Sequence, residues 1–366
     1  MIYDVAVIGA GVFGAWTAHH LVRAGVRVVL LDIYGAANSR ASSGGESRII
    51  RMGYGADEIY TRSAMRSLGL WLDFCERTGL PLFRQTGVLW TAAEGDTYSL
   101  STRQTLSRCG VRFELLAPAA LETRFPQMQF APGAYGILEP ESGAIMARQA
   151  VHAVVEDAVR GGMTYLAATR PDAVIARTYV YACGPWLSKI FPELLGSRIV
   201  PTRQEVFFFG APAGDPRFRP PAMPVWIDFS DPRGPYGFPD LDGRGVKIAL
   251  DRHGEVADPD SLDRVPNAEG LAEARACLEA RFPALRGAPV IEARVCQYEN
   301  TSNGDFLIDR HPDLEDVWLV GGGSGHGFKH GPAVGEYAAA RILGGGTAEP
   351  RYSLVTKAES QNRTVF

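Results

Sequence analysis

The chain has 366 residues, of which 46% are hydrophobic and 21% are charged, and its formal net charge is −4. These values are typical of a globular protein with a large core, and the small negative charge gives no reason to expect nucleic acid as a partner. No apolar run approaches the ~20 residues of a membrane-spanning helix, so no membrane association is expected.

The first part of the chain has the pattern of a dinucleotide-binding βαβ unit. An apolar run leads directly into Gly9, Gly11 and Gly14, a helix-like stretch follows, and a second apolar run ends in an acidic residue. Gly9 allows a sharp turn, Gly11 allows close approach of a pyrophosphate, and Gly14 allows the helix to pack close to the sheet. The acid, Asp32, suits a ribose hydroxyl and argues against a 2′-phosphate, hence against NADP.

The remaining apolar patterns predict a series of helices and strands. Helices are expected at residues 58–77, 102–109, 120–125, 146–159, 271–282 and 332–343. Strands are expected at residues 87–91, 179–184, 205–209, 245–250 and 317–320, and residues 136–140 are interpreted as a turn. Residues 35–47 are a small polar loop, and residues 321–329 are a glycine-dense loop before the last helix.

Both ends of the chain look like nucleotide-fold material, whereas the middle looks like mixed sheet. We therefore predict an α/β fold in which a Rossmann-like cofactor domain is built from separated segments and interleaved with an α+β substrate domain that carries a mixed sheet. The cofactor domain is assigned residues 1–85, 140–205 and 291–366, and the substrate domain residues 86–139 and 206–290.

Five cysteines are scattered along the chain without the spacing of a metal site, namely Cys75, Cys109, Cys183, Cys277 and Cys296. An odd number of dispersed cysteines fits a reducing compartment and is compatible with one functional thiol. The first strand begins by Tyr3, which leaves no space for a leader peptide. We therefore expect a cytoplasmic protein without a bound metal.

Several further segments occur in one order along nearly the whole chain. They are residues 48–51 with 53–55, then 86–89, 139–143, 236–239, 245–247, 296–298, 306–312 and 324–329. Together with the opening glycine motif, they make the chain resemble the amine-oxidising flavoproteins of the D-amino-acid-oxidase superfamily. The resemblance is closest to monomeric sarcosine oxidase and N-methyltryptophan oxidase, and many segments in order are more specific than one glycine motif.

The resemblance implies FAD as the cofactor, bound covalently by the sulfur of Cys296 to the flavin 8α-methyl group. Such attack needs a thiolate, which nearby positive charge favours; the alternative is a buried structural cysteine. The resemblance assigns cofactor contacts to Gly9, Gly11, Val12, Phe13, Gly14, Asp32, Ser42, Ser43, Arg48, Cys183, Gly184, Trp186, Cys296, Gly323, Gly325, His326, Gly327, Phe328 and Lys329.

Three basic residues match family positions with a defined task. Arg51 and Lys329 match the pair that binds the substrate carboxylate, a natural use for an arginine fork and a lysine point charge. Lys247 matches the lysine that serves oxygen activation, because a fixed cation stabilises the superoxide that forms from O₂. For each of them the alternative is a solvated surface charge.

Four further residues match positions around the flavin and the substrate. Arg48 matches an arginine near the flavin, and His326 with its glycine loop matches the segment against the flavin ring, where N–H groups stabilise the reduced anion. Tyr236 and Tyr298 match aromatic residues of the substrate pocket. The alternatives are a loop histidine held by backbone hydrogen bonds and core packing of the tyrosines.

The chain departs from the family pattern in three places. Asp251 stands where the family has a pocket histidine, so it either contacts a cationic or hydroxyl-bearing group of the substrate or is solvated. Ser43 and Gly44 replace a histidine pair before Arg48. The segment 161–179 is short, so we expect a trimmed crossover before the strand that ends in Gly184.

The resemblance therefore implies oxidation of the C–N bond of an amino acid with a secondary amine to an imine, with O₂ reduced to H₂O₂. The partners are the amino acid and O₂, and a monomer is expected because close relatives act alone. One alternative is a flavin dehydrogenase that passes electrons to another acceptor, and another is a flavin-binding protein without turnover. An NAD-dependent dehydrogenase is permitted by the βαβ unit alone and is the weakest reading.

Overall fold

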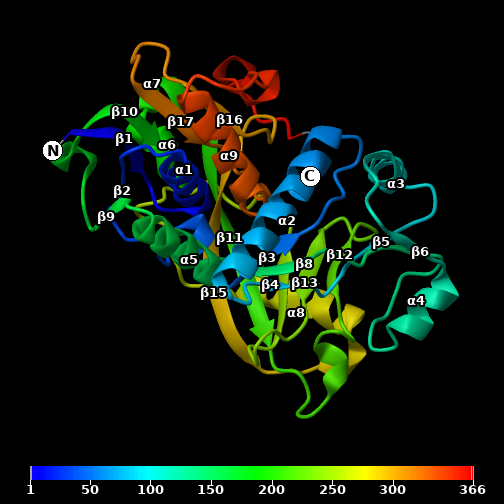
Figure 1. Cartoon of the computed structure of the whole chain (residues 1–366). Coiled ribbons are helices and arrows are strands. Elements are labelled where there is room, and N and C mark those ends of the chain that lie inside the picture. Colours follow the sequence, from blue (N-terminus) through cyan, green and yellow to red (C-terminus); the bar gives the residue numbers. More distant parts are fainter. Residues whose placement is uncertain (1, 364, 366) are drawn as a thin grey trace.

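The computed structural model describes residues 2–363 and 365, which build two large sheets (Figure 1). The first sheet has six strands in the order β16-β17-β10-β1-β2-β9, all parallel except β16 at the edge. Its strands are β1 Ile2–Ile8, β2 Val28–Asp32, β9 Thr164–Ala167, β10 Ile175–Tyr181, β16 Leu307–Arg310 and β17 Val317–Gly321. Strands from the two ends of the chain thus lie in one nucleotide-binding type of sheet.

Three helices form a packed layer with this sheet: α1 Val12–Arg23, α5 Ala147–Arg160 and α9 Gly331–Ile342. The long helix α2, Glu58–Thr78, packs against α9 beside them (Figure 1). Proline at the second position of α9 suits the first turn of a helix, since its missing N–H would have no partner there. Trp16 and Trp71, both fully buried, fill the space between α1 and α2 with ring centroids 4.9 Å apart.

The second sheet has eight strands in the order β15-β11-β14-β13-β12-β5-β7-β6, antiparallel except where β12 meets β5. Its strands are β5 Val88–Ala92, β6 Glu114–Leu116, β7 Tyr135–Glu139, β11 Ile199–Phe209, β12 Val225–Asp228, β13 Pro235–Phe238, β14 Val246–Leu250 and β15 Val290–Thr301. Helix α8, Ala268–Arg281, covers it over a second apolar core that includes Phe218, Trp226 and Phe282.

Smaller elements complete the fold. Helices α3 Thr97–Cys109 and α4 Pro118–Arg124 lie at the outer end of the second sheet (Figure 1), and the short helices α6 Leu187–Ile190 and α7 Pro192–Leu195 follow β10. A third sheet is formed by β3 Ser47–Ile50, β4 Phe83–Arg84 and β8 Gly143–Met146, in the order β3-β8-β4. Among the described residues, no helix is long and apolar enough to cross a membrane.

The predicted α/β fold with a mixed-sheet substrate region is confirmed, with corrections to single elements. Residues 136–140 were expected to turn, but 135–139 form strand β7, whose partners β5 and β6 are distant in sequence. Strand β11 starts at Ile199, six residues before the predicted start. Its first half was missed because Pro201 and the three polar residues that follow it do not give an apolar strand pattern. That half pairs with β15 and not with β14, and its other edge forms only one isolated bridge, between Thr202 and Val256. The carbonyl oxygen of Pro201 accepts there from the N–H of Ala257 at 3.0 Å, so the missing N–H of proline costs no ladder bond.

The segment between α5 and β10 is as short as expected, with the single strand β9 and one 3-10 turn at Pro171–Ala173. The predicted domain boundaries near 205 and 290 fall inside β11 and at the start of β15. These two strands pair along their whole length, so they join the two regions mechanically. The boundaries themselves stay a prediction.

The contact between α1 and α9 depends on a helical glycine. A Cβ added at Gly335 would lie 2.5 Å from the carbonyl carbon of Trp16, whereas one added at Gly69 in α2 meets no atom within 4 Å. We predict that Gly335→Ala lowers the free energy of unfolding by about 1–3 kcal/mol through overpacking. Gly69→Ala is the control and should be neutral or stabilising by up to ~1 kcal/mol, since alanine favours helix.

Thermal unfolding of both variants at equal cofactor content measures the difference. A Gly335→Ala protein as stable as the Gly69→Ala protein would contradict the close packing of α1 and α9.

Candidate functional site

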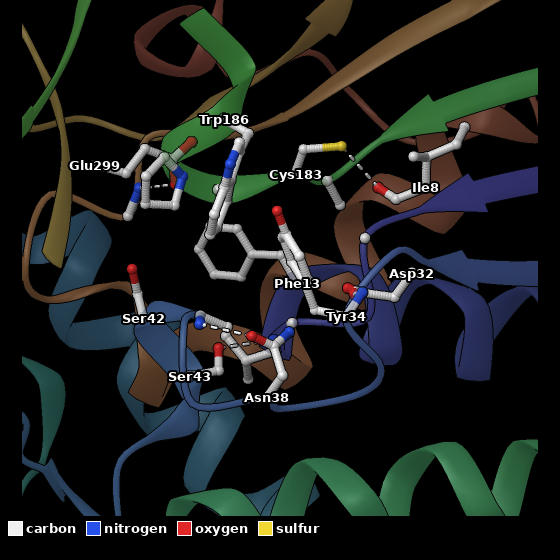
Figure 2. Close-up of a pocket in the computed structure, with 18 of the residues that line it drawn as sticks. Ile8, Phe13, Asp32, Tyr34, Asn38, Ser42, Ser43, Cys183, Trp186 and Glu299 are labelled. Atoms are coloured by element: carbon white, nitrogen blue, oxygen red, sulfur yellow. Dashed lines mark hydrogen bonds between the residues drawn. The ribbon is translucent and has the colours of Figure 1, made fainter. Parts of the chain in front are cut away.

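A cavity of about 710 Å³ opens at the carboxyl ends of the parallel strands β1, β2, β9 and β10 (Figure 2). This is the place where open α/β sheets bind their ligands, and the volume lies within the range of cofactor sites. Segments from the second sheet and from the C-terminal glycine loop close its other side, at 296–299 and 323–328. The cavity is therefore a junction of distant parts of the chain.

The glycines of the opening motif have separate structural tasks. Gly9 has φ +103°, and a Cβ there would collide with the carbonyl oxygen of Ala182 on the neighbouring segment. A Cβ at Gly14 would collide with the carbonyl oxygen of Gly9, so α1 packs directly on the turn. At Gly11 the nearest atom to an added Cβ is the Ser43 hydroxyl at 3.5 Å, which leaves an open cradle on the cavity side.

Polar contacts fix this turn in place. The N–H of Val12, at the start of α1, donates to the Ser43 hydroxyl over 3.0 Å. The Asp32 carboxylate accepts from the N–H groups of Ala10 at 2.8 Å and Tyr34 at 2.7 Å, and burial raises its pKa. Asp32 therefore ties the glycine turn to the end of β2 while it lines the cavity.

Two thiols line the cavity in different surroundings. The Cys296 sulfur on β15 lies 3.8 Å from Nη2 of Arg48. Arg48 is held by donation to the carbonyl oxygens of Ser42 at 2.5 Å and Ser47 at 2.8 Å. The Cys183 thiol instead donates to the carbonyl oxygen of Ile8 at 3.3 Å, and burial raises its pKa. The guanidinium beside Cys296 and the carbonyl oxygen beside Cys183 thus give the two sulfur atoms different polar neighbours.

Glu299 is a residue of the cavity wall that the sequence reasoning missed. It directly follows the family segment 296–298 on β15, and this position was the one sign in the sequence that Glu299 could belong to the site. Burial raises its pKa to about 7, and Oε2 accepts from the N–H of Gly323 over 3.5 Å. Its Oε1 has no hydrogen-bond partner among the described residues. An unsatisfied acceptor on this wall suits a hydroxyl donor, and FAD carries several.

A smaller cavity of about 70 Å³ lies against the first and shares Arg48, Cys296 and Tyr298 with it. Lys247 and Tyr236 line this smaller cavity, at the second sheet. The Lys247 ammonium donates to the carbonyl oxygen of Ser47 at 3.0 Å and lies 4.3 Å from the Phe238 ring centroid. Burial and the nearby Arg48 guanidinium hold the pKa of Lys247 well below its usual value.

Arg51 and Lys329 meet at one tyrosine behind the glycine loop, and both are buried. The Arg51 guanidinium lies 4.5 Å from the ring centroid of Tyr54 and 4.6 Å from that of Trp90. The Lys329 ammonium donates to the Tyr54 hydroxyl at 2.7 Å and to the carbonyl oxygen of His326 at 2.9 Å. Among the described residues, neither cation has a carboxylate as an ion-pair partner.

The segment that carries Arg51 is positioned by a second missed residue, Glu139, which is almost fully buried. Its carboxylate accepts from the N–H groups of Met52 at 2.7 Å and Gly53 at 3.1 Å, and from the Trp90 indole at 2.9 Å. The sequence showed Glu139 only as part of a family segment. Its partners lie on the neighbouring strand β5 and in the loop after β3, far away in sequence, and could not be inferred from local pattern.

His326 belongs to the Tyr54 cluster and does not line either cavity. Its ring stacks on Phe306 with centroids 4.9 Å apart, and its two nitrogens lie 3.1 Å from the Tyr54 hydroxyl and 2.9 Å from the Gly304 carbonyl oxygen. Burial and Lys329 hold the pKa of His326 well below its usual value, so the ring is neutral.

Asp251 is neither freely solvated nor isolated. Tyr298 donates to its Oδ1 over 3.4 Å, and the guanidinium of Arg363 lies 3.7 Å from its Oδ2. Burial raises the pKa of Tyr236 to about 12 and that of Tyr298 further still, so both phenols keep their protons at neutral pH. Asp251 therefore sits at the edge of the pocket that the two tyrosines flank.

The structure thus gathers most of the predicted site residues around the large cavity. Seventeen positions of the prediction line it: Gly9, Gly11, Val12, Phe13, Asp32, Ser42, Ser43, Arg48, Cys183, Gly184, Trp186, Cys296, Tyr298, Gly323, Gly325, Gly327 and Phe328. Gly14 lies beneath the turn, and the remaining predicted residues lie at the smaller cavity, in the Tyr54 cluster or at Asp251. The roles of these residues stay predictions.

Among the described residues, no group of three or more His, Cys, Asp or Glu side chains is arranged to hold a metal ion.

Comparison with known proteins agrees with this geometry. Residues 4–341 match the model of the DAO family, described as FAD dependent oxidoreductase. The monomeric sarcosine oxidase of Bacillus sp. (strain B-0618) is 31% identical, over 94% of this chain and 93% of that protein. The N-methyl-L-tryptophan oxidase of Salmonella newport (strain SL254) is 27% identical, over 94% of this chain and 95% of that protein.

A solved structure supports the fold. The L-proline dehydrogenase from P. horikoshii matches with a TM-score of 0.85 and 22% identity, over 96% of this chain and 97% of that chain. At this identity the likeness concerns the fold alone. With the family match over nearly the whole chain and relatives above 30% identity, the protein belongs to the DAO family of FAD-dependent oxidoreductases and, within it, to the sarcosine oxidase family.

Proposed function

We propose that the protein oxidises the C–N bond of an amino acid with a secondary amine to an imine and uses O₂ as the electron acceptor. One observation carries the proposal: Arg51 and Lys329 are buried against the same tyrosine, directly behind the glycine loop of the cofactor cavity. Two buried basic groups that have no ion-pair carboxylate among the described residues suit a substrate that carries a carboxylate.

The chain's side chains would divide the work as follows. Arg51 and Lys329 hold the substrate carboxylate. Tyr236 and Tyr298 enclose the rest of the substrate, and both phenols stay protonated and uncharged because their pKa values are raised. Such orientation is the main contribution of an enzyme of this kind. FAD, held by the opening turn, Ser43, Asp32 and the glycine loop, supplies two-electron redox chemistry when bound.

Lys247 supports O₂ as the acceptor in preference to another electron carrier. It is buried next to the cavity wall that contains Arg48 and Cys296, and its ammonium group is held by Ser47. A fixed cation at this place favours formation of superoxide from O₂. We also propose a cytoplasmic location, which is supported by five cysteines that are all free thiols.

An anaerobic screen tests the reaction directly. N-methyl and cyclic amino acids are mixed with the holoenzyme without O₂, and loss of the flavin absorbance bands is recorded. Bleaching by a secondary-amine amino acid, followed by H₂O₂ release on admission of air, is the expected result. Bleaching without peroxide would identify a dehydrogenase, and no bleaching by any amino acid would contradict the proposed activity.

We predict a thioether between Cys296 and the flavin, because Arg48 lies beside this sulfur. The yellow colour should then stay with the protein after acid precipitation in the wild type and in the control Cys183→Ser, whose thiol lines the same cavity. Cys296→Ser should release the colour into the supernatant. A Cys296→Ser precipitate that remains yellow would disprove the assignment.

We predict that Lys247→Met slows reoxidation of the reduced enzyme by about 100-fold or more, the size expected for loss of one preorganised electrostatic group. Anaerobic reduction should be unaffected. Because a lysine with a lowered pKa loses its charge at lower pH, wild-type reoxidation should slow as pH rises, with a midpoint below the ~10.4 of a free lysine. Stopped-flow absorbance measures both half-reactions, and equal loss in both would contradict this role.

We predict that Arg51→Met weakens binding of a carboxylate ligand by about 10- to 100-fold, which corresponds to one charged hydrogen bond of ~1.5–3 kcal/mol. Arg310→Met is the control, since Arg310 is exposed and stacks on Trp318 away from the site. Titration of the flavin spectrum with acetate measures the affinity. Unchanged affinity in Arg51→Met would rule out the carboxylate site.

A further inference from the structure

A continuous row of hydrogen-bonding groups links Lys329 to helix α2. The Lys329 nitrogen lies 2.7 Å from the Tyr54 hydroxyl, which in turn lies 2.7 Å from Nε2 of His330. Nδ1 of His330 lies 2.9 Å from the hydroxyl of Ser63, a half-buried residue of α2. His330 itself has no exposed surface, and Lys329 is 5% exposed. The row thus runs from a buried amine toward the surface.

Proton positions in this row follow from its fixed ends. Nε2 of His326 faces the Gly304 carbonyl oxygen at 2.9 Å, and because a carbonyl only accepts, this nitrogen carries the proton. Nδ1 of His326 therefore accepts, 3.1 Å from the Tyr54 hydroxyl. When Lys329 is charged, it donates to Tyr54, and Tyr54 donates to His326.

When Lys329 is neutral, the same hydroxyl turns and donates to the lysine nitrogen. In this neutral state His330 donates from Nε2 to Tyr54 and accepts from Ser63 at Nδ1. The Tyr54 hydroxyl thus offers Lys329 a partner in both charge states with no movement of heavy atoms, and His326 Nδ1 loses its donor when the hydroxyl turns to the amine.

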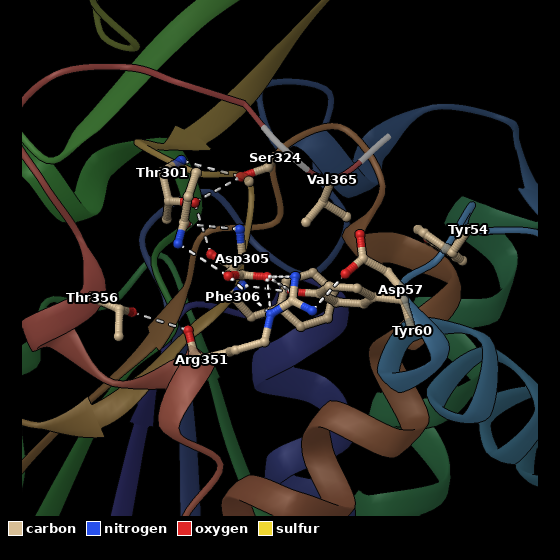
Figure 3. A network of polar contacts seen from close by, with 12 residues as sticks. Tyr54, Asp57, Tyr60, Thr301, Asp305, Phe306, Ser324, Arg351, Thr356 and Val365 are labelled. Carbon is tan, nitrogen blue, oxygen red and sulfur yellow. Dashed lines mark hydrogen bonds and ion pairs between the residues drawn. The ribbon is translucent and has the colours of Figure 1, made fainter. Parts of the chain in front are cut away.

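The charges around the row leave Lys329 without compensation. On α2 and the C-terminal segment, Tyr60 donates to Asp305 at 2.8 Å, and Arg351 is paired with Asp305 and with Asp57, so these acids are already used (Figure 3). Burial and Arg51 lower the pKa of Lys329, with a smaller effect of the same sign from Arg363. Asp251 and Glu139 raise the pKa of Lys329, each by less than Arg51 lowers it. The pKa of His330 is lowered by burial and by Lys329, so its ring is neutral.

We infer that Lys329 takes up one proton when a carboxylate ligand binds, and that Ser63, His330 and Tyr54 form the path by which this proton arrives. Ser63 passes its proton to Nδ1 of His330, His330 passes the Nε2 proton to Tyr54, and Tyr54 passes its own to Lys329. Ser63 is then reprotonated from solvent, so one solvent proton converts the amine to the ammonium. His330 ends as the other neutral tautomer, with its proton on Nδ1 facing Ser63 and Nε2 free to accept from Tyr54. The inference rests on the proposed carboxylate site and adds a protonation step to it.

The uptake is tested by equilibrium binding of acetate to the holoenzyme, followed by the flavin spectrum between pH 7 and 9. Above the pKa of Lys329 in the free enzyme, the acetate Kd should rise about tenfold per pH unit, because each bound acetate requires one proton. Lys329→Met should bind weakly with a Kd that does not depend on pH. A pH-independent Kd in the wild type would overturn the inference and leave the carboxylate site intact, whereas no acetate binding at any pH would contradict both.

The path is tested by kinetics with a pH indicator in a stopped-flow instrument. His330→Ala should keep the pH dependence of Kd but slow proton uptake at least about tenfold, whereas the control His19→Ala, which removes a buried histidine of α1, should not slow it. Added imidazole should restore the rate in His330→Ala more than 1,2,4-triazole does, since the two have the same shape but different basicity. Equal rescue by both, or no slowing at all, would exclude a proton path through His330.

Discussion

The fold holds two basic side chains in its interior and gives neither an ion-pair carboxylate among the described residues. Arg51 and Lys329 are 7% and 5% exposed, and both lie against Tyr54. Burying an isolated charge costs several kcal/mol, so such a pair is retained where a ligand supplies the counter-charge. The arrangement around them follows from this need: Glu139 holds the segment that carries Arg51, and the glycine loop places Lys329 at the start of the last helix.

The cofactor cavity and the cationic cluster are joined by the glycine loop. Gly325 and Gly327 line the cavity, while Lys329, two residues further on, already belongs to the Tyr54 cluster. Strand β15 makes a second link, because Cys296 and Glu299 lie on the cavity wall while the strand itself pairs with β11 in the second sheet. The large cavity therefore lies where both sheets meet.

How far the sequence predicts this site depends on the distance over which each residue acts. The opening turn is largely local: Gly14 and Asp32 contact residues of the turn and its flanking strand, and their positions were predicted from spacing. Glu139 and Glu299 act across sheets, so no periodicity reveals them. Their neighbourhood was visible only as part of a resemblance to a family.

The Tyr54 cluster was the least predictable part. The cluster is assembled from separate parts of the chain: Tyr54 lies in a loop, His330 just before α9, and Ser63 on α2. Each of them alone looks like an ordinary core or surface residue. The ring of His326 lies in this cluster, with Nε2 at the Gly304 carbonyl oxygen, and its predicted contact with the flavin stays a prediction. Strand β7 was missed for the same reason, since its partners β5 and β6 are brought to it by the tertiary fold.

A change of ligand tests the proposed carboxylate receptor without altering the protein. Reduction of the flavin is followed anaerobically with an amino acid that bleaches it and with the amide of the same amino acid, which keeps the amine and loses the negative charge. We predict that the amide reduces the flavin at least about tenfold more slowly at equal concentration, because it loses one charged contact. Equal rates for the acid and its amide would show that Arg51 and Lys329 do not bind the substrate carboxylate.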